Sequence, residues 1–294
     1  MGVHASPLTW LTRVLWFTLP LTLGDLIAAG LDGRSDAVRV AGTAMWWTVW
    51  FVGLLAAMVL SIRTLVLLRV LAPVPLLAAI VAATDGAPSA LGWVGLATAA
   101  VVAVTAMAAE VGLDFVNAAS YGDERRFPLR PPAALLLGPV QLVWAVAVVP
   151  LPVGVLLAAD QRWAVGLPLI AVGVAGAWWA AVTLSRLALR WVVVVPAGLT
   201  IVDPMTLMDP VLLRREAVRS LEPAVAGTTA HDLTGGAPGL VLEIDLSEPV
   251  TITPTVGRHQ VASELDVTEV LITPTRPGEL IRHAAGRDIA TAPA

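Results

Sequence analysis

The sequence contains no cysteine and no lysine. Without cysteine the chain has no disulfide, no thiolate metal site and no cysteine nucleophile. Each of its 18 basic residues is therefore an arginine. Together with the abundance of alanine, valine, glycine and proline, this composition indicates GC-rich codons rather than selection at any one site.

Charge of either sign is scarce. Charged residues make up 14% of the 294 residues, hydrophobic residues make up 57%, and the mean hydropathy is +0.81. A soluble domain has about 25% charged residues, so this composition excludes a soluble globular protein. The apolar excess precedes Arg190 and gathers in segments of about 20 residues, which as helices are long enough to cross about 30 Å of hydrocarbon. We therefore expect an integral membrane protein.

A hydropathy window of about 19 residues places six spans in this apolar region. They cover residues 11–30, 43–61, 64–84, 90–110, 132–158 and 164–184. Pro150 and Pro152 near the end of the fifth span predict a kink or tilt there. The first span has an alternative, because Arg13, an apolar run and three small residues also fit a secretory signal peptide. Asp25 interrupts that run and favours a span.

The distribution of arginine predicts the orientation, because the cytoplasmic loops of membrane proteins are rich in basic residues. The loops after the second, fourth and sixth spans hold Arg63, Arg125, Arg126, Arg130, Arg186 and Arg190, and Arg69 lies just inside the membrane beyond the first of these loops. Tryptophans mark the opposite ends of these spans, as an outer aromatic belt would; they are Trp46, Trp47, Trp93 and Trp163. The sequence thus predicts a multi-pass protein of the plasma membrane with both termini in the cytoplasm.

From Arg190 the pattern changes to short runs of valine, isoleucine, leucine and threonine separated by proline and glycine, which is typical of an antiparallel β domain. The clearest strand alternates apolar and polar residues over 240–246. Ser247-Glu248-Pro249 predicts a turn after it. We expect seven strands and a short final helix that ends near Gly286; the strands are 191–195, 199–202, 211–213, 218–221, 240–246, 250–253 and 269–273.

Two stretches of this region, RWVVVVPAGLTIVDPMTLMDPVLLRREAVRSLEP and VLITPTRPGELIRHA, carry a resemblance. Their Gly-Leu-x-Ile-x-Asp second strand, arginine-rich approach to the fourth strand and Thr-Pro-x-x-Pro step into the last helix resemble the bacterial pleckstrin-homology-like (PH-like) domain that is often attached to membrane spans. The resemblance covers the last third of the chain. It implies a seven-stranded, strongly bent sheet with one end covered by the helix, and it implies no common ligand.

The sequence therefore predicts an α-helical polytopic membrane bundle followed by a small all-β domain with a C-terminal helix. The six-helix transmembrane domain covers residues 1–189 and the cytoplasmic PH-like β domain covers 190–288, with a disordered tail over 289–294. The first part has 10 arginines against 9 acids, and residues 190–294 have 8 against 13. The β domain is thus the acidic part of the chain.

Charges at membrane depth are the first candidates for a functional site, because a buried charge is costly unless it is paired or hydrated. Asp25 and Arg69 are the two candidates. Each would either line an ion or substrate path or play a structural role, with Asp25 as a helix-end carboxylate and Arg69 reaching the headgroups. The sequence favours the structural role for both.

Catalytic and cofactor signatures are lacking. The four histidines, at positions 4, 231, 259 and 283, all lie outside the predicted spans, which excludes a serine–histidine pair at membrane depth. Phosphate-binding glycine loops, paired-histidine metal motifs and nucleotide signatures are absent. We therefore expect no catalytic residue, no cofactor and no metal.

Arg125, Arg126 and Arg130 form a basic loop beside the membrane. They would bind anionic lipid, contact the acidic β domain or set the topology alone; we expect loop 114–131 to contact the β domain. The first hairpin of that domain, around Pro196-Ala197-Gly198, lacks basic residues, so we do not expect it to bind anionic headgroups.

These features favour a non-enzymatic scaffold or interaction protein whose partners are the lipid bilayer and another protein bound through the β domain. Nucleic acid is not an expected partner. A small transporter or channel subunit with a cytoplasmic regulatory domain is the alternative, and a lipid-modifying enzyme is a distant third. Polar groups that line a cavity within the membrane would favour the transporter.

Overall fold

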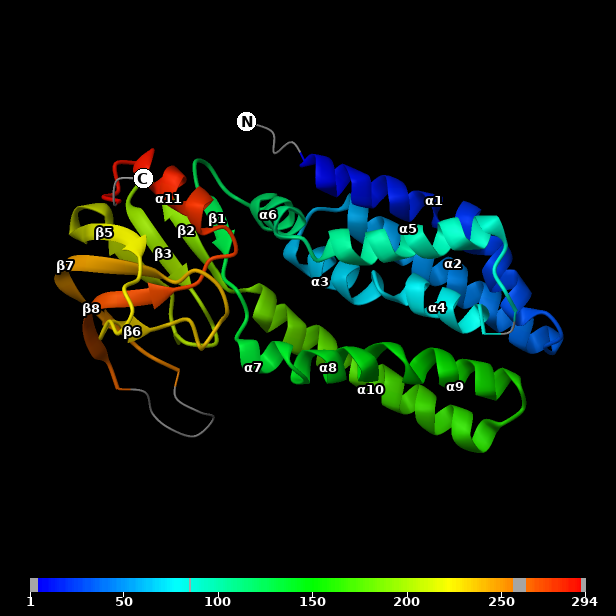
Figure 1. Ribbon diagram of the computed structural model, residues 1–294. Helices are drawn as coiled ribbons and strands as arrows, with labels where there is room; N and C mark the ends of the chain where they lie inside the picture. Colours follow the sequence, from blue (N-terminus) through cyan, green and yellow to red (C-terminus); the bar gives the residue numbers. More distant parts are fainter. Residues whose placement is uncertain (1–4, 85, 256–262, 292–294) are drawn as a thin grey trace. The chain divides into compact units, whose positions relative to one another are not determined.

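The computed structural model describes residues 5–84, 86–255 and 263–291 (Figure 1). The chain forms two compact units. The helical unit comprises Met1–Ala118 and Val140–Leu184, and the β unit comprises Ala119–Pro139 and Ser185–Ala294. The change of pattern at Arg190 predicts a domain boundary there, whereas the β unit also takes residues 119–139 from between two membrane segments. The chain therefore passes between the two units three times.

The helical unit has the segments of a membrane bundle. Within the described residues, five are long and apolar enough to cross a membrane: Pro7–Leu31 (α1), Asp36–Met58 (α2), Ile62–Ala82, Ala133–Ala159 and Trp163–Ala188 (α10). Ala90–Ala106 (α5) and Ala109–Asn117 (α6) pass the same test together, with a bend of 58° between them, and make six if they count as one span. Each predicted span overlaps one of these segments, so the predicted apolar helices are confirmed.

Two of these segments are interrupted by proline. Ile62–Ala82 divides into Ile62–Leu71 (α3) and Val74–Ala82 (α4), with Pro73 between them. Ala133–Ala159 divides into Ala133–Leu136 (α7), Pro139–Val148 (α8) and Pro150–Ala159 (α9). Proline has no N–H to continue the helical ladder. The break between α8 and α9, at Pro150, lies where the sequence predicts a kink.

Helix α1 packs against α2, α4, α5 and α6, and its Trp16, Leu19 and Leu23 are fully buried. Trp16 and Trp50 of α2 exchange hydrogen bonds, since each indole N–H donates to the other residue's carbonyl oxygen, at 2.9 and 3.2 Å. Gly53 of α2 leaves room for the Trp16 ring, because a Cβ there would lie 1.8 Å from it. This integral packing favours a membrane span for α1 over a signal peptide.

Glycines allow the helices to approach closely. A Cβ at Gly95 of α5 would lie 2.5 Å from the Thr22 carbonyl oxygen of α1. Gly173 and Gly176 of α10 would meet the backbone at Leu151 and Val146 in the same way, at 2.5 and 2.7 Å. Segment α8–α9 and helix α10 therefore form a hairpin with close backbone contact.

The β unit contains two four-stranded sheets within the described residues (Figure 1). One has the order β1-β2-β3-β4, and the other has the order β5-β7-β8-β6. Neighbouring strands are antiparallel except β6 and β8. The strands are Arg125–Pro128 (β1), Trp191–Val195 (β2), Gly198–Val202 (β3), Val211–Arg214 (β4), Val218–Pro223 (β5), His231–Asp232 (β6), Leu242–Ile252 (β7) and Leu265–Ile272 (β8), followed by helix Pro277–Ala285 (α11).

Three features of the β unit differ from the prediction. Two strands are missing from the predicted set: β1, which pairs with β2, and the short β6, which pairs with β8. The two strands expected over 240–253 are one strand, β7, because the register shift between Asp245 and Val250 is a bulge where a turn is predicted. The tail expected to be disordered starts in the fold: Ile289 is 2% exposed, and the Ala290 carbonyl accepts a hydrogen bond from Leu221. Residues 292–294 lie outside the described residues.

Candidate functional site

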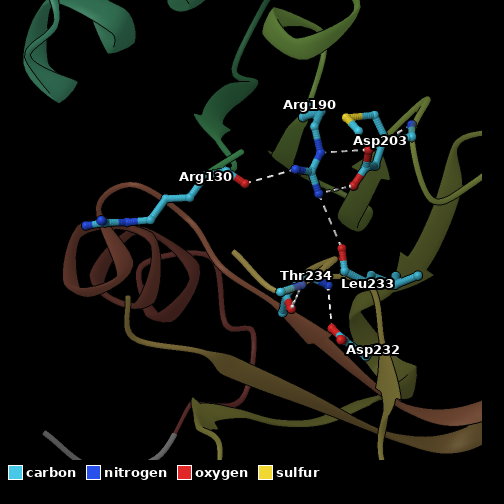
Figure 2. Close-up of polar contacts among 8 residues, drawn as sticks. Arg130, Arg190, Asp203, Asp232, Leu233 and Thr234 are labelled. Carbon is cyan, nitrogen blue, oxygen red and sulfur yellow. Dashed lines mark hydrogen bonds and ion pairs between the residues drawn. The ribbon is translucent and has the colours of Figure 1, made fainter. Parts of the chain in front are cut away.

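Among the described residues of the β unit, the most deeply buried charges are those of Arg190 and Asp203, with side chains 1% and 0% exposed (Figure 2). Arg190 lies directly before β2 and Asp203 directly after β3. The guanidinium Nε and Nη2 atoms donate to the two carboxylate oxygens at 2.8 and 2.7 Å. This two-pronged pairing satisfies both charges in a place that water does not reach.

The same pair joins distant segments of the chain. Nη1 of Arg190 donates to the carbonyl oxygen of Arg130 at 2.9 Å, and Nη2 also reaches the carbonyl oxygen of Leu233 at 3.4 Å (Figure 2). The Arg190 carbonyl in turn accepts from the backbone N–H of Leu129 at 3.0 Å. The ion pair therefore connects the β2–β3 hairpin, the loop after β6 and residues 119–139, which come from between two membrane segments and are called the inter-span segment below. Neither residue is among the predicted site residues.

The three arginines of the predicted basic loop do not converge on one ligand. Arg125 forms an ion pair with Glu279 of α11 at 2.7 Å. Arg126 pairs with Glu124 at 2.6 Å, and its guanidinium lies over the Trp191 ring, 5.6 Å from the centroid. The expected contact between this loop and the β domain is present, and it is closer than a surface ion pair because the loop supplies strand β1.

Arg130 points its side chain away from the Arg190 guanidinium (Figure 2). Its side chain lies against Gly239, where a Cβ would be 3.0 Å from the Arg130 Nε atom. Gly239 also has a φ of +120°, which favours glycine. The Nε atom is buried and has no hydrogen-bond partner among the residues described. Arg130 is thus a packed part of the β unit.

Asp25 and Arg69, the two intramembrane candidates, lie in different surroundings. Asp25 is exposed on the outer surface of the helical unit. A hollow of about 180 Å³ between α1 and α2 is lined by apolar groups, Thr43 and two tryptophans, and Asp25 is not part of the lining. Arg69 is half-buried, and its Nε donates to the Ala106 carbonyl at the C-terminus of α5 at 3.3 Å.

Arg13 and Asp114 also bind helix ends. Arg13, 7% exposed, donates to the carbonyls of Ala57 and Met58, where α2 ends, at 2.9 and 3.4 Å. Asp114 accepts from the Ser6 N–H and the Thr9 hydroxyl at the N-terminus of α1, at 2.7 and 2.6 Å. Cations are stabilised at helix C-termini and anions at N-termini. These charges, like Arg69, therefore have a structural partner inside the bundle.

Arg69 also supports the bend between α5 and α6. Its guanidinium lies against Gly112 of α6, where a Cβ would be 2.9 Å from Nη2. The bend frees carbonyls at the end of α5, and Arg69 binds the one at Ala106. From the sequence, Arg69 is expected to reach the headgroups; in the structure its partner is the Ala106 carbonyl.

The arginines near β4 and β5 are closer to the first hairpin than their sequence positions suggest. Arg214 pairs with Gly198 across β3 and β4, and the Arg215 N–H donates to the Ala197 carbonyl at 2.9 Å. The hairpin lacks basic residues of its own, but Arg214 and Arg215 are thus its neighbours. Acidic groups lie beside them as well: Arg215 pairs with Glu216 at 3.4 Å, and Arg219 pairs with Asp245 at 3.1 Å.

Glu216 is exposed. A hydrogen bond from its own backbone N–H lowers the pKa of this carboxyl, and Arg215 and Arg214 lower it further. This glutamate therefore stays ionised beside the arginines. Over the described ranges, no group of three or more histidine, aspartate or glutamate side chains is placed to hold a metal ion.

Compared with family models, curated proteins and solved structures, the chain matches none. The functional conclusion therefore depends on the geometry of the two units. In both units, buried charges join backbone segments that lie far apart in the sequence.

Proposed function

We propose that this chain is a plasma-membrane protein that acts as a non-enzymatic scaffold and uses its β unit as a PH-like interaction module in the cytoplasm. The observation that carries the proposal is the origin of the strands in that unit. β1 comes from a connection between membrane segments, β2 follows the last membrane helix, and the two pair over four residues. The β unit is thus tied to the membrane part at three points in the chain.

This arrangement supports a specific topology. Because one folded unit lies on one side of a membrane, the chain must return after Pro139 to the side from which it left. Helices α8–α9 and α10 then make two crossings. Arg125, Arg126 and Arg130 in the β unit favour the cytoplasmic side.

The same side is favoured for the start of the chain. Ser6 and Thr9 are hydrogen-bonded to Asp114, which lies just before the chain enters the β unit at Ala119. The first described residues therefore lie at the end of the helical unit from which the chain enters the β unit. Both termini in the cytoplasm is the topology that fits these contacts.

The resemblance in sequence implies a bent sheet that is covered at one end by the last helix. The two mainly antiparallel sheets and the helix that follows them support this PH-like assignment. A non-enzymatic role is supported by the use of the intramembrane charges. Arg13, Arg69 and Asp114 bind helix ends, and Asp25 faces outward. Arg13, Arg69 and Asp114 thus have a structural explanation without a substrate.

One observation favours the alternative of a small transporter or channel subunit. The interruption between α3 and α4 frees carbonyls at membrane depth, and Trp144 of α8 donates to the carbonyl of Val70 there at 2.8 Å. Interrupted helices that meet within the membrane are a feature of transporters. Here the freed carbonyl is bound by an indole and is not left open to an ion.

Photo-crosslinking in living cells tests the proposal. A photoreactive residue is placed at Met208 or Leu212 on the β unit, 63% and 44% exposed, and at Trp178 on α10 as a control. The proposal predicts discrete protein adducts from the two β positions and lipid adducts from Trp178. It also predicts that Arg190→Met abolishes the protein adducts. No protein adduct from either β position, together with ion or solute flux in proteoliposomes that depends on Asp25 or Arg69, would replace it with the alternative.

A further inference from the structure

Helix α11 is fastened to the inter-span segment by several contacts within the β unit. Arg125 of β1 forms an ion pair with Glu279 at 2.7 Å. Arg287, just after the helix, donates to the carbonyl of Asp123. Just before the helix, the Thr275 N–H donates to the Pro128 carbonyl at 2.8 Å. The last helix and the strand that comes from between the membrane spans therefore hold each other in place.

His283 lies at the centre of this contact. Its ring centroid is 5.9 Å from that of Phe127, which is fully buried, and the two rings are tilted by 54°. Its Nε2 atom is buried and has no hydrogen-bond partner among the residues described. A neutral imidazole can pack against Phe127 in this way, whereas a charged one would need a partner for its second N–H.

The charged groups around His283 oppose a second positive charge. Arg125 faces it from β1, and Arg287 faces it from just after the end of α11. Glu279, one turn earlier in α11, is the acidic group near it, and this carboxylate is already paired with Arg125. An imidazolium here would lie near two guanidinium groups and compete for one shared carboxylate.

We propose that α11 is a pH-sensitive latch on the inter-span segment, which opens when His283 takes up a proton. The proposal adds regulation to the interaction module, and it depends on the proposed function only for placing the β unit in the cytoplasm. Opening would release β1 from α11. Because β1 follows α6 in the chain, it would also release the segment that connects α6 to β1.

The direction of the pH effect follows from linkage. Burial lowers the pKa of His283, and Arg125 and Arg287 lower it further, while Glu279 opposes them. A detached α11 has a histidine with an ordinary pKa of about 6.5 and binds the proton more readily. The latch is therefore at full strength above about pH 6.5 and weakens as the pH falls towards the lowered pKa. Each unit of that shift changes the closed-to-open ratio about tenfold.

Hydrogen exchange of the full-length protein in nanodiscs measures the latch directly. The amides of α11 are followed from about pH 7.5 to pH 5.5, the range in which histidine titrates, with correction for the intrinsic exchange rate. We expect their protection to fall across this range while that of β7 stays constant. His283→Gln should remove the pH step, and His231→Gln, the matched control in β6, should keep it.

A second variant keeps the proposal falsifiable if His283→Gln fails to fold. Arg125→Gln removes a positive neighbour of His283 and one of the two arginines paired with Glu279, the other being Arg276, so the midpoint of the step should move to higher pH. An unchanged midpoint would overturn the proposal. So would constant protection of α11 in the wild type, or a pH step that survives in His283→Gln. The result of the photo-crosslinking experiment at one pH does not affect these outcomes.

Discussion

Leu129 and Arg190 are bound backbone to backbone, with the N–H of Leu129 donating to the carbonyl of Arg190 at 3.0 Å. These residues flank the α8–α10 hairpin, one before it and one after it. The Arg190 guanidinium forms a further hydrogen bond, which it donates to the carbonyl oxygen of Arg130. The two ends of the α8–α10 hairpin are thus joined within the β unit.

Loss of either charge of the buried pair should destabilise the β unit. Arg190→Met leaves Asp203 buried without its partner, and removing one member of a buried pair costs about 3–5 kcal/mol. Protease resistance of the β unit in the full-length protein measures the effect. Arg219→Gln, which breaks the exposed pair with Asp245, is the control and should cost about 0–1 kcal/mol. Equal effects of the two variants would contradict a special role for Arg190.

The close approach of α5 to α1 predicts opposite effects for two glycines. Gly95→Ala should destabilise the helical unit, because the new Cβ would lie 2.5 Å from the Thr22 carbonyl oxygen. Gly24→Ala has nothing within 4 Å of the new Cβ and should be neutral or stabilising by up to about 1 kcal/mol. Thermal unfolding in detergent compares them. A stable Gly95→Ala protein would show that the helices are further apart.

The membrane topology is tested by reporter fusions after Gly86 and after Arg190. The first position follows α4, and the second follows α10 at the start of β2. The six-span arrangement predicts that the reporters lie on opposite sides of the membrane, with the one after Arg190 in the cytoplasm. If both reporters lie on the same side, the arrangement is wrong.

The β unit should not select anionic lipid, although Arg214 and Arg215 lie beside its first hairpin. The unit has 12 arginines against 15 acids, so its long-range field does not attract an anionic membrane. We expect the β unit, assembled from residues 119–139 and 185–294, to sediment equally with anionic and neutral vesicles at about 0.15 M salt. Binding to anionic vesicles that salt weakens and Arg214→Gln with Arg215→Gln abolishes would contradict this.

The sequence predicts the membrane segments well because hydropathy over 20 residues is a local signal. Most strands of the β unit are also predicted, from their alternation and their turns. Strand β1 is missed because four residues, Arg-Arg-Phe-Pro, carry no clear period and lie between two spans. The turn predicted at Pro249 is a bulge because β7 continues its pairing with β8 to Ile252, and this depends on a partner strand that local sequence does not reveal.

Candidate site residues are harder to predict, because their partners are remote. In the sequence Asp203 looks like part of an acidic loop, and only the fold shows that Arg190 pairs with it. Asp114 lies 108 positions from Ser6, and no local pattern joins them. Arg69 is noticed as a charge at membrane depth, but its role depends on where α5 ends and bends. Sequence reasoning therefore finds the unusual charges, and the fold assigns their partners.

Disulfide trapping tests most directly whether the inter-span segment is a strand of the β unit. The chain has no native cysteine, so Arg126→Cys and Val193→Cys introduce a single pair at directly opposed positions of β1 and β2. Opposed residues have Cα atoms about 4.5–5.5 Å apart, within the range of a disulfide. A protease site inserted at Gln161, in the turn between α9 and α10, then separates the two cysteines in the chain.

After oxidation and cleavage, the two fragments should stay joined until a reductant is added. The control pair, Arg126→Cys with Leu212→Cys, places the second cysteine on β4, two strands further away, and should give separate fragments. The fragments of the Arg126→Cys and Val193→Cys protein would instead separate without reductant, as in the control, if β1 and β2 were not paired. That result would contradict a β unit built from the chain before and after the α8–α10 hairpin.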